Sequence, residues 1–151
     1  KIILDGGTSK IGLESTIIDL TNKPIILREG KITSEKIYQI IRKKVHIKKK
    51  IKNIKSPGQF KFHYSPGIPV YMNKNKPKKG GAFIIFGKKP KSGKNYFSLS
   101  KSNNLNEAAN NLYKTMRNIK KLKYKSISVC KIPSSGLGNA INDRLKKASY
   151  K

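Results

Sequence analysis

The sequence predicts an α/β protein made of two parts and a connector. Residues 67–151 alternate apolar runs with amphipathic stretches, in an order that favours a small parallel sheet covered by helices. Residues 1–45 combine a β-hairpin pattern with one amphipathic stretch, which is too little for an independent core. Residues 46–66 lose all periodicity and carry Pro and Gly breakers, so we expect them to form a linker.

The N-terminal part begins with strand signals. The apolar run 2–4 ends in the turn sequence Asp5-Gly6-Gly7 and is typical of a strand. The runs 15–20 and 24–30 are rich in β-branched residues and are separated by residues 21–23. This spacing predicts a hairpin.

An amphipathic helix is expected after the hairpin. Thr33 is placed to cap it, and Glu35 lies in its first turn, where a carboxylate interacts favourably with the helix dipole. Four apolar residues keep helical spacing: Ile37, Ile40, Ile41 and Val45. We interpret residues 1–45 as the end of a larger α/β domain, and because residue 1 is Lys we expect the chain to lack that domain's N-terminal part.

Residues 67–151 predict four strands and two helices. The strand-like runs are 68–72, 81–86, 95–99 and 126–132. A long helix follows the third run, capped by Asn104 with Glu107 three residues later. Its apolar stripe comprises Leu105, Ala108, Ala109, Leu112, Tyr113, Met116 and Ile119. A second helix over 139–149 completes a Rossmann-like parallel layer.

The formal charge of +28 favours a polyanionic partner such as nucleic acid. The 35 basic residues are 31 Lys and 4 Arg, however, and they accompany 21 Ile and 13 Asn, a bias that an AT-rich genome also produces. Both interpretations stay open. The stretch from Lys36 to Asn106 contains no Asp or Glu, which favours polyanion binding.

Cysteine and hydropathy exclude several classes of protein. Cys130 has no second cysteine for an internal disulfide, and with His46 and His63 it supplies too few ligands for a zinc cage. No apolar run reaches the length of about 20 residues that spans a bilayer. We therefore expect a soluble cytoplasmic protein with no membrane partner and no structural metal.

Polar residues at the ends of two predicted strands are the first candidates for ligand binding. Ser15 and Thr16 lead directly into a strand, where α/β folds collect ligand-binding groups, although hydroxyl residues also simply begin strands. Glu14 could act as an acid or base, but no second carboxylate lies at a telling spacing. Arg28 ends the next strand, and an arginine in a lysine-biased chain indicates a site that needs two parallel donors for phosphate or carboxylate.

The linker and one turn supply the other candidates. Alternating aromatic residues in the linker predict an extended segment that presses one face onto a surface: Phe60, Phe62 and Tyr64. His63 lies among them and could donate to a phosphate, whereas His46 has no such context. The sequence PSSGLG at 133–138 could bind an anion at a helix start, but a tight strand-to-helix turn explains it more simply.

Taken in order, five segments resemble the C-terminal part of the two-domain threonylcarbamoyl-AMP synthases: DGG, GLESTIIDL, ILREGKITSEKI, SPGQFKFHYSPGIPV and GLGNAINDRLKKAS. In this family a YrdC-type catalytic domain is joined by an ordered linker to a small Rossmann-like domain. The resemblance implies that residues 1–45 end the YrdC-type domain, that residues 46–66 cover the active site, and that residues 67–151 form the C-terminal domain.

The resemblance also implies an activity. These enzymes are nucleotidyltransferases, in which threonine and bicarbonate form an N-carboxylated threonine whose carboxylate attacks the α-phosphate of ATP. The products are threonylcarbamoyl-AMP and pyrophosphate, and the first is passed to a transferase complex that modifies an adenosine of tRNA. ATP is a substrate, expected with Mg²⁺, and no tightly bound cofactor or covalent catalytic residue is implied. A weak contact with tRNA is a further expectation.

Three residues match substrate contacts of the family. Ser15 matches a serine that contacts L-threonine, and Arg28 and His63 match residues that contact ATP. The chain departs from the pattern at Glu29, where proline is common, and at residues 59–60, where Gln-Phe replaces Met-Lys. The Lys/Arg and Ser-x-Asn motifs that hold most of the ATP lie upstream in such enzymes, so we expect this chain alone to be inactive.

Two other functions stay open. The acid-free span and the interleaved aromatic residues also suit a module that binds tRNA or another nucleic acid. The turn at 133–138 would suit a regulatory domain that binds a nucleotide.

Overall fold

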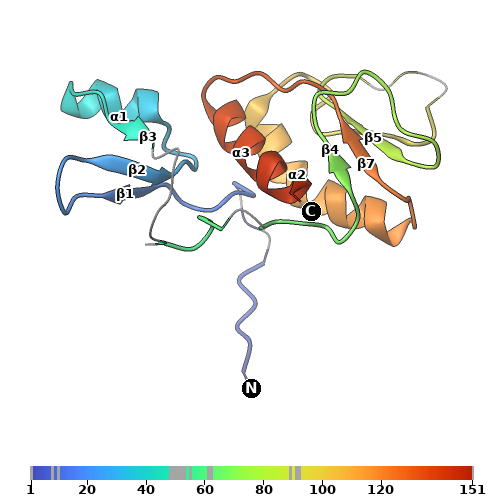
Figure 1. Ribbon diagram of the computed structural model, residues 1–151, viewed down its shortest axis with the longest axis horizontal. Coiled ribbons are helices and arrows are strands. Elements are labelled where there is room, and N and C mark those ends of the chain that lie inside the picture. Colours follow the sequence, from blue (N-terminus) through green and yellow to red (C-terminus); the bar gives the residue numbers. More distant parts are fainter. Residues whose placement is uncertain are drawn as a thin grey trace.

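The protein contains two β-sheets, each with its own helices (Figure 1). The structure, a computed structural model, describes residues 2–7, 9, 11–47, 54, 56–60, 63–88, 90 and 93–150. A three-stranded sheet and one helix form the N-terminal part, and a four-stranded sheet and two helices form the C-terminal part. The α/β class expected from the sequence is confirmed.

The N-terminal sheet is built on the expected hairpin. Strands β1 (Ile17–Asp19) and β2 (Ile25–Arg28) pair antiparallel. The Asp19 carboxylate closes the turn between them by accepting from the N–H and the hydroxyl of Thr21, at 3.0 and 2.6 Å. Strand β3 (His46–Ile47) adds parallel to β2. Strand β3 lies within the segment predicted to be linker. The sequence could not show it, because a strand of two residues is too short to have a recognisable periodicity.

Helix α1 (Ser34–Ile41) begins where expected, with Thr33 as its N-cap, but it ends early. Arg42 takes a left-handed conformation with φ of 54°, and its N–H donates to a carbonyl of the last turn. Val45, expected on the helix, follows it instead and packs in a small cluster with Ile26 and Ile37. Ile40 is 80% exposed, so the predicted apolar face of this helix is wrong at that position.

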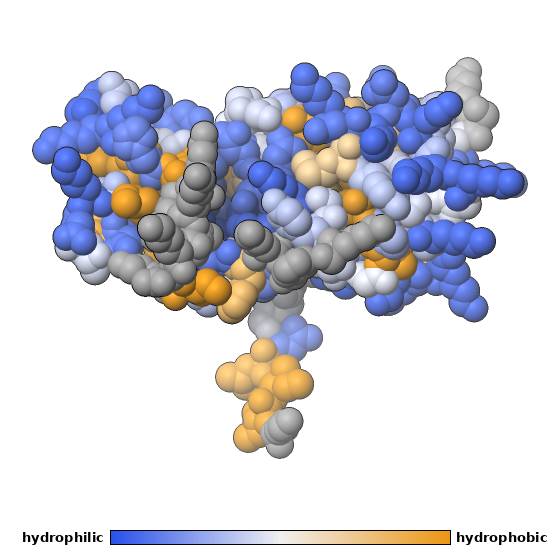
Figure 2. All heavy atoms as spheres, in the orientation of Figure 1, coloured by the Kyte–Doolittle hydropathy of each residue, from blue (hydrophilic) through white to orange (hydrophobic). Residues whose placement is uncertain are grey.

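The N-terminal residues 2–4 are not a strand, contrary to expectation. They are irregular, and their side chains are 88–92% exposed. Figure 1 shows them extending away from both sheets, and Figure 2 shows the same tail as an isolated group of hydrophobic atoms. No described strand pairs with this run, so its apolar side chains have no surface to pack on.

The C-terminal sheet is parallel throughout, as predicted. Its strands follow the order β4-β7-β5-β6 and comprise Val70–Tyr71 (β4), Ala82–Ile85 (β5), Tyr96–Ser98 (β6) and Ile127–Val129 (β7). Helices α2 (Leu105–Lys121) and α3 (Leu137–Ser149) lie side by side against it (Figure 1). Their apolar faces and the strands form the main core of the molecule.

The predicted cap of α2 is confirmed. The Asn104 side chain accepts from the N–H groups of Asn106 and Glu107, at 2.8 and 3.1 Å. The Glu107 carboxylate accepts from the hydroxyl of Ser100 at 2.6 Å, and that hydroxyl oxygen accepts from the Asn104 N–H at 2.8 Å. In the usual capping box the glutamate side chain accepts from the N–H of the N-cap residue; here the Ser100 hydroxyl accepts from the Asn104 N–H instead. None of the described helices is long and apolar enough to cross a bilayer.

Candidate functional site

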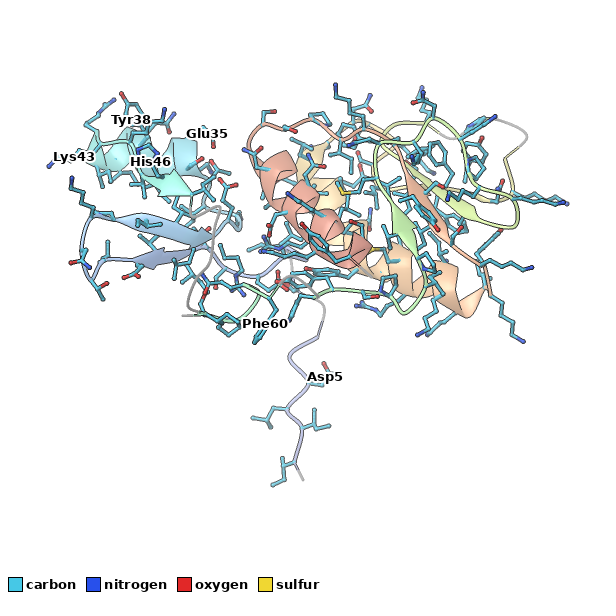
Figure 3. All side chains as sticks on the ribbon, viewed as in Figure 1. Asp5, Glu35, Tyr38, Lys43, His46 and Phe60 are labelled. Carbon is cyan, nitrogen blue, oxygen red and sulfur yellow. The ribbon has the colours of Figure 1, made fainter. Side chains whose placement is uncertain are left out.

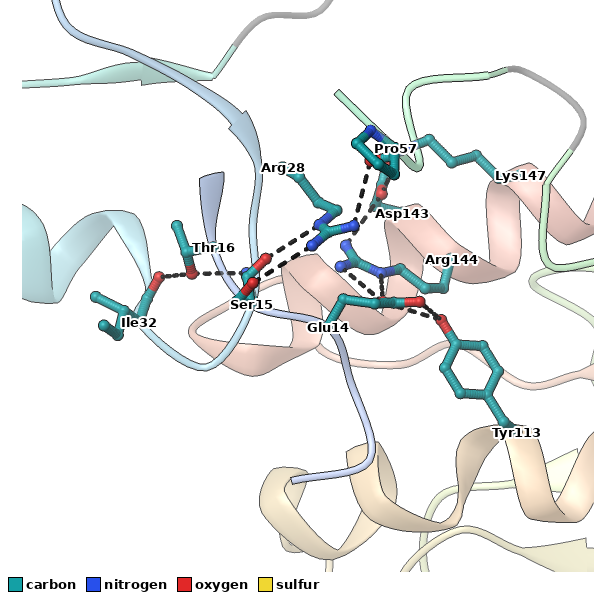
Figure 4. Close-up of polar contacts among 11 residues, drawn as sticks. Glu14, Ser15, Thr16, Arg28, Ile32, Pro57, Tyr113, Asp143, Arg144 and Lys147 are labelled. Carbon is teal, nitrogen blue, oxygen red and sulfur yellow. Dashed lines mark hydrogen bonds and ion pairs between the residues drawn. The ribbon is translucent and has the colours of Figure 1, made fainter. Parts of the chain in front are cut away.

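Arg28 connects the mouth of β1 to the linker (Figure 4). This side chain is nine-tenths buried at the end of β2. Its Nε donates to the Ser15 carbonyl at 3.0 Å and its Nη2 donates to the Ser15 hydroxyl at 3.5 Å. Its Nη1 donates to the Pro57 carbonyl at 3.2 Å. The structure therefore brings the candidates Ser15 and Arg28 into direct contact and adds a linker carbonyl.

Strand pairing explains this geometry. Ile17 pairs with Arg28 in the hairpin, so Ser15 lies just before β1 beside the end of β2. Thr16 fixes the position, because its hydroxyl donates to the Ile32 carbonyl at 2.6 Å and accepts from the Gly30 N–H at 2.9 Å. The hydroxyl of Thr16 therefore holds the loop, while that of Ser15 remains at an exposed position.

The linker turn is closed by its own residues. The Ser56 N–H donates to the side-chain carbonyl of Gln59 at 3.1 Å, which gives this glutamine a structural role. Gly58 has φ of 82°, and a Cβ added there would lie 2.6 Å from the Tyr64 hydroxyl oxygen and 3.2 Å from Arg28 Cδ. Only glycine fits between these two side chains without movement.

His63 and Tyr64 pack behind this turn. The Tyr64 ring stacks on Tyr113 of α2 with centroids 5.6 Å apart, and the His63 ring meets Tyr64 edge-on at 4.0 Å. Among the described residues no group forms a hydrogen bond with the buried His63 Nδ1. His63 therefore contacts Tyr64, which packs behind the turn that Arg28 binds. Among the contacts described, no hydrogen bond joins His63 to Ser15 or Arg28.

The predicted alternation of linker aromatics is wrong for Phe60. Its side chain is 53% exposed, whereas Tyr64 is packed against α2. Tyr64 also has φ of 65°, so the backbone there is not extended. Phe62 lies outside the described residues.

An ion cluster around the buried Arg144 lies directly beside Ser15 (Figure 4). Arg144 of α3 is 0% exposed, and its Nε and Nη2 both donate to Glu14 Oε2 at 3.2 Å. The Tyr113 hydroxyl donates to Glu14 Oε1 at 3.2 Å. Arg144 Nη1 donates to Asp143 at 3.2 Å, and Lys147 also donates to that carboxylate, at 2.6 Å.

The ionisation of this cluster follows from its surroundings. Burial alone would raise the pKa of Glu14, but a backbone hydrogen bond and the charge of Arg144 outweigh it, so the pKa lies below its ordinary value. Burial and the nearby Glu14 charge raise the pKa of Tyr113 far above its ordinary value. At neutral pH Glu14 is therefore ionised beside the Arg144 guanidinium, and Tyr113 keeps its proton.

Sequence reasoning missed Arg144 and Tyr113 as site residues. Tyr113 was assigned to the apolar stripe of α2, and nothing in its context distinguishes it from the other members. Arg144 carries the same signal that singled out Arg28, an arginine where codon bias favours lysine. That signal marks Arg144 but does not show which residue it contacts.

A family model supports the resemblance deduced from the motifs. The model described as threonylcarbamoyl-AMP synthase, C-terminal domain, matches residues 32–149. The chain belongs to this family. The threonylcarbamoyl-AMP synthases of Pyrococcus abyssi and Bacillus subtilis are 30% and 31% identical to it over 97% of its length. The chain spans about half the length of these curated relatives, since it covers 48% of each.

Solved structures of this synthase family share the fold. The crystal structure of P. abyssi Sua5 complexed with L-threonine matches with a TM-score of 0.81 and 29% identity, over 96% of this chain and 48% of that one. A variant of the same protein, with a histidine and the adjacent tyrosine replaced by alanine, matches with a TM-score of 0.78 and 27% identity. It covers 96% of this chain and 47% of that one.

The turn at 133–138, considered above as an anion cradle, is a tight structural turn. The Gly138 N–H donates to the Ser135 carbonyl at 2.9 Å and the Asn139 N–H to the Gly136 carbonyl at 3.2 Å, so these donors are already used. A Cβ on Gly138 would lie 1.8 Å from the Pro133 carbonyl oxygen. Close packing explains this glycine.

The other polar groups of interest lie elsewhere. His46 lines a groove of 720 Å³ together with Glu35 and Tyr38, between α1 and β3 (Figure 3). Glu29 follows Arg28 but is buried, and burial raises the pKa of its carboxyl group. Within the described part of the chain, no three His, Cys, Asp or Glu side chains gather where they could hold a metal ion.

Proposed function

We propose that this chain is the C-terminal half of an L-threonylcarbamoyladenylate synthase. As a nucleotidyltransferase, the whole enzyme makes threonylcarbamoyl-AMP and pyrophosphate from L-threonine, bicarbonate and ATP. The observation that carries the proposal is the position of Arg28, which connects the Ser15 backbone and hydroxyl to the linker carbonyl of Pro57. Membership of the family and the likeness to a structure that contains L-threonine support it.

We assign one role to each candidate residue. The Ser15 hydroxyl forms a hydrogen bond with the bound L-threonine. Arg28 and His63 face the ATP phosphates, where a guanidinium and an imidazole donate to oxygen atoms that carry negative charge. Mg²⁺ comes with the triphosphate and binds to its oxygen atoms.

The chemistry needs positioning more than a covalent nucleophile. A carboxylate oxygen of N-carboxythreonine forms a bond to the α-phosphorus, and the bond to the bridging oxygen breaks as pyrophosphate leaves. Charge develops on phosphate oxygens, so fixed cations and excluded water lower the barrier. The hydrogen bond from Arg28 to the Pro57 carbonyl and the stacking of Tyr64 on Tyr113 support a linker that covers Arg28, and we expect it to exclude water there. The product then serves a tRNA-modifying transferase complex in the cytoplasm.

Three substitutions in the full-length enzyme test these roles. Ser15→Ala should raise KM for L-threonine, and Arg28→Ala and His63→Ala should raise KM for ATP or slow pyrophosphate release. Loss of a hydrogen bond to a charged group costs about 1.5–3 kcal/mol, which is about tenfold to a hundredfold. His46→Ala is the matched control, since this histidine lies in the groove beside α1. Wild-type kinetics in all three variants would reject the assignments.

A weak contact with tRNA is the second candidate function. A pocket of 590 Å³ beside α2 is lined by four cations and no acidic residue: Lys101, Lys114, Arg117 and Lys121. Binding of tRNA to the chain should weaken steeply with salt, and replacement of these four residues should reduce the salt slope. The control replaces four lysines elsewhere on the surface. An equal reduction of the salt slope in that control would show that net charge alone is responsible.

A further inference from the structure

The segment before Ser15 is anchored on the C-terminal domain. Leu13 is 9% exposed and belongs to the main core, and Ile11 packs against that core. Gly12 has φ of 68°, and a Cβ there would lie 2.5 Å from Asn110 Cα and 2.8 Å from the Ala109 carbonyl oxygen. The loop therefore contacts the backbone of α2 directly, and it is fixed by residues about a hundred positions further along the chain.

The next residue, Glu14, is held by side chains from both C-terminal helices. Arg144 of α3 donates twice to one carboxylate oxygen, and Tyr113 of α2 donates to the other. Arg144 is 130 residues away from Glu14 in sequence, and Tyr113 is 99. These contacts hold the carboxylate at both oxygens and so restrict the backbone to which it is attached.

Ser15 lies between this anchor and the N-terminal sheet. Its carbonyl and hydroxyl contact Arg28, and Thr16 is bound to the loop after β2. We infer that the C-terminal domain positions the L-threonine-binding serine through Arg144 and Tyr113, which hold Glu14. The inference rests on the role proposed for Ser15. It makes Arg144 a positioning residue of the reaction, one that acts through Glu14 and Ser15.

Stability alone does not account for a buried arginine here. Leu13 and Gly12 already attach the loop to the core. A buried ion pair is often no more stabilising than apolar residues of the same volume, because both charges lose their water. What the planar guanidinium adds is direction, because its Nε and Nη2 converge on Glu14 Oε2 while the Tyr113 hydroxyl donates to Oε1, so that both oxygens of the carboxylate are held.

The test uses the full-length enzyme and compares Arg144→Met with Lys146→Met. Arg144→Met should raise KM for L-threonine by about tenfold to a hundredfold, as a displaced binding group does, while KM for ATP changes little. Tyr113→Phe should raise the same constant by a smaller factor, since the two donors of Arg144 still hold the carboxylate. Lys146 is an exposed residue of α3 outside the ion cluster, so its replacement should leave both constants unchanged. Calorimetric titration with L-threonine should show the same loss of affinity in Arg144→Met.

The outcomes separate this inference from the proposed function. A wild-type enzyme that forms no product from L-threonine, bicarbonate and ATP would overturn both. An active wild type, with unchanged L-threonine affinity in a folded Arg144→Met variant, would overturn the inference alone. A fall in kcat that follows the fraction of folded enzyme, with both KM values unchanged, would show that Arg144 is merely structural and would also overturn it.

Discussion

The ion pair between Glu14 and Arg144 predicts an unequal effect of two matched substitutions on stability. Glu14→Met and Arg144→Met each replace one charged partner by the same apolar side chain. The Arg144 side chain is 0% exposed, whereas that of Glu14 is 32% exposed. The residue left behind is therefore a fully buried cation in the first variant and a carboxylate that water can reach in the second. We expect Glu14→Met to be the more destabilising change.

The structure sets the magnitudes. Removing one partner of a buried pair costs about 3–5 kcal/mol, and the lower end applies here because Asp143 still accepts from Arg144. In Arg144→Met the carboxylate regains water and keeps its bond to Tyr113, so the loss should be about 1 kcal/mol. The double variant has no unpaired buried charge. Its free energy of unfolding should therefore be about 2 kcal/mol higher than that of Glu14→Met, which is the difference between the costs of the two single substitutions.

Urea unfolding of the chain, followed by far-UV circular dichroism, measures these differences. The double variant closes a mutant cycle, and an interaction larger than about 0.5 kcal/mol separates coupled from independent sites. Arg144→Met more destabilising than Glu14→Met would refute the reasoning. So would additive effects, because they would mean that the two charges do not interact in the folded protein.

Three further predictions concern pH and packing. The folded-state pKa of Glu14 is lowered, so its contribution to stability is present above the ordinary value of 4.5 and is lost as pH falls below it; melting temperatures of Glu14→Gln should vary less over this acid range. The pKa of Tyr113 is raised, so its contribution is present below the ordinary value of 10.0 and is lost as pH rises above it; Tyr113→Phe should remove that alkaline loss. Gly138→Ala should cost about 3 kcal/mol in urea unfolding because its Cβ would overlap the Pro133 carbonyl, whereas Gly6→Ala, with open space around it, should cost almost nothing. Equal midpoints for these two glycine variants would contradict the packing argument.

The C-terminal domain could be predicted because its signals are local. The Asn104 cap, the apolar stripe of α2 and the short buried strands each show within a few residues of sequence. The early end of α1 could not be predicted, since Val45 keeps helical spacing but is buried from the loop after Arg42. Residues 2–4 have the composition of a strand but no described strand beside them, and composition cannot show whether a partner strand is present.

The candidate site also contains residues that the sequence could place and residues that it could not. Ser15 and Arg28 could be placed together, since a hairpin brings the start of one strand to the end of the other. Arg144 and Tyr113 could not be placed beside Glu14, because these contacts depend on how helices α2 and α3 pack against a loop about a hundred residues earlier in the chain. The scarcity of arginine marks Arg144, but it marks the exposed Arg42 equally. Burial, which the sequence does not show, distinguishes them.

The contacts around Ser15 form a closed ring through all three parts of the chain. Arg28 joins Ser15 to Pro57, the linker continues to Tyr64, Tyr64 stacks on Tyr113, and Tyr113 binds the carboxylate of the residue before Ser15. Each contact is modest, about 1 kcal/mol for a hydrogen bond or an aromatic pair, so none alone fixes the geometry. A ring restricts each member from two sides, however, and a displacement of the linker is therefore resisted by the C-terminal domain as well as by Arg28. The Ser15 hydroxyl lies within this ring, and Arg144 reinforces it by donating to the same Glu14 carboxylate as Tyr113.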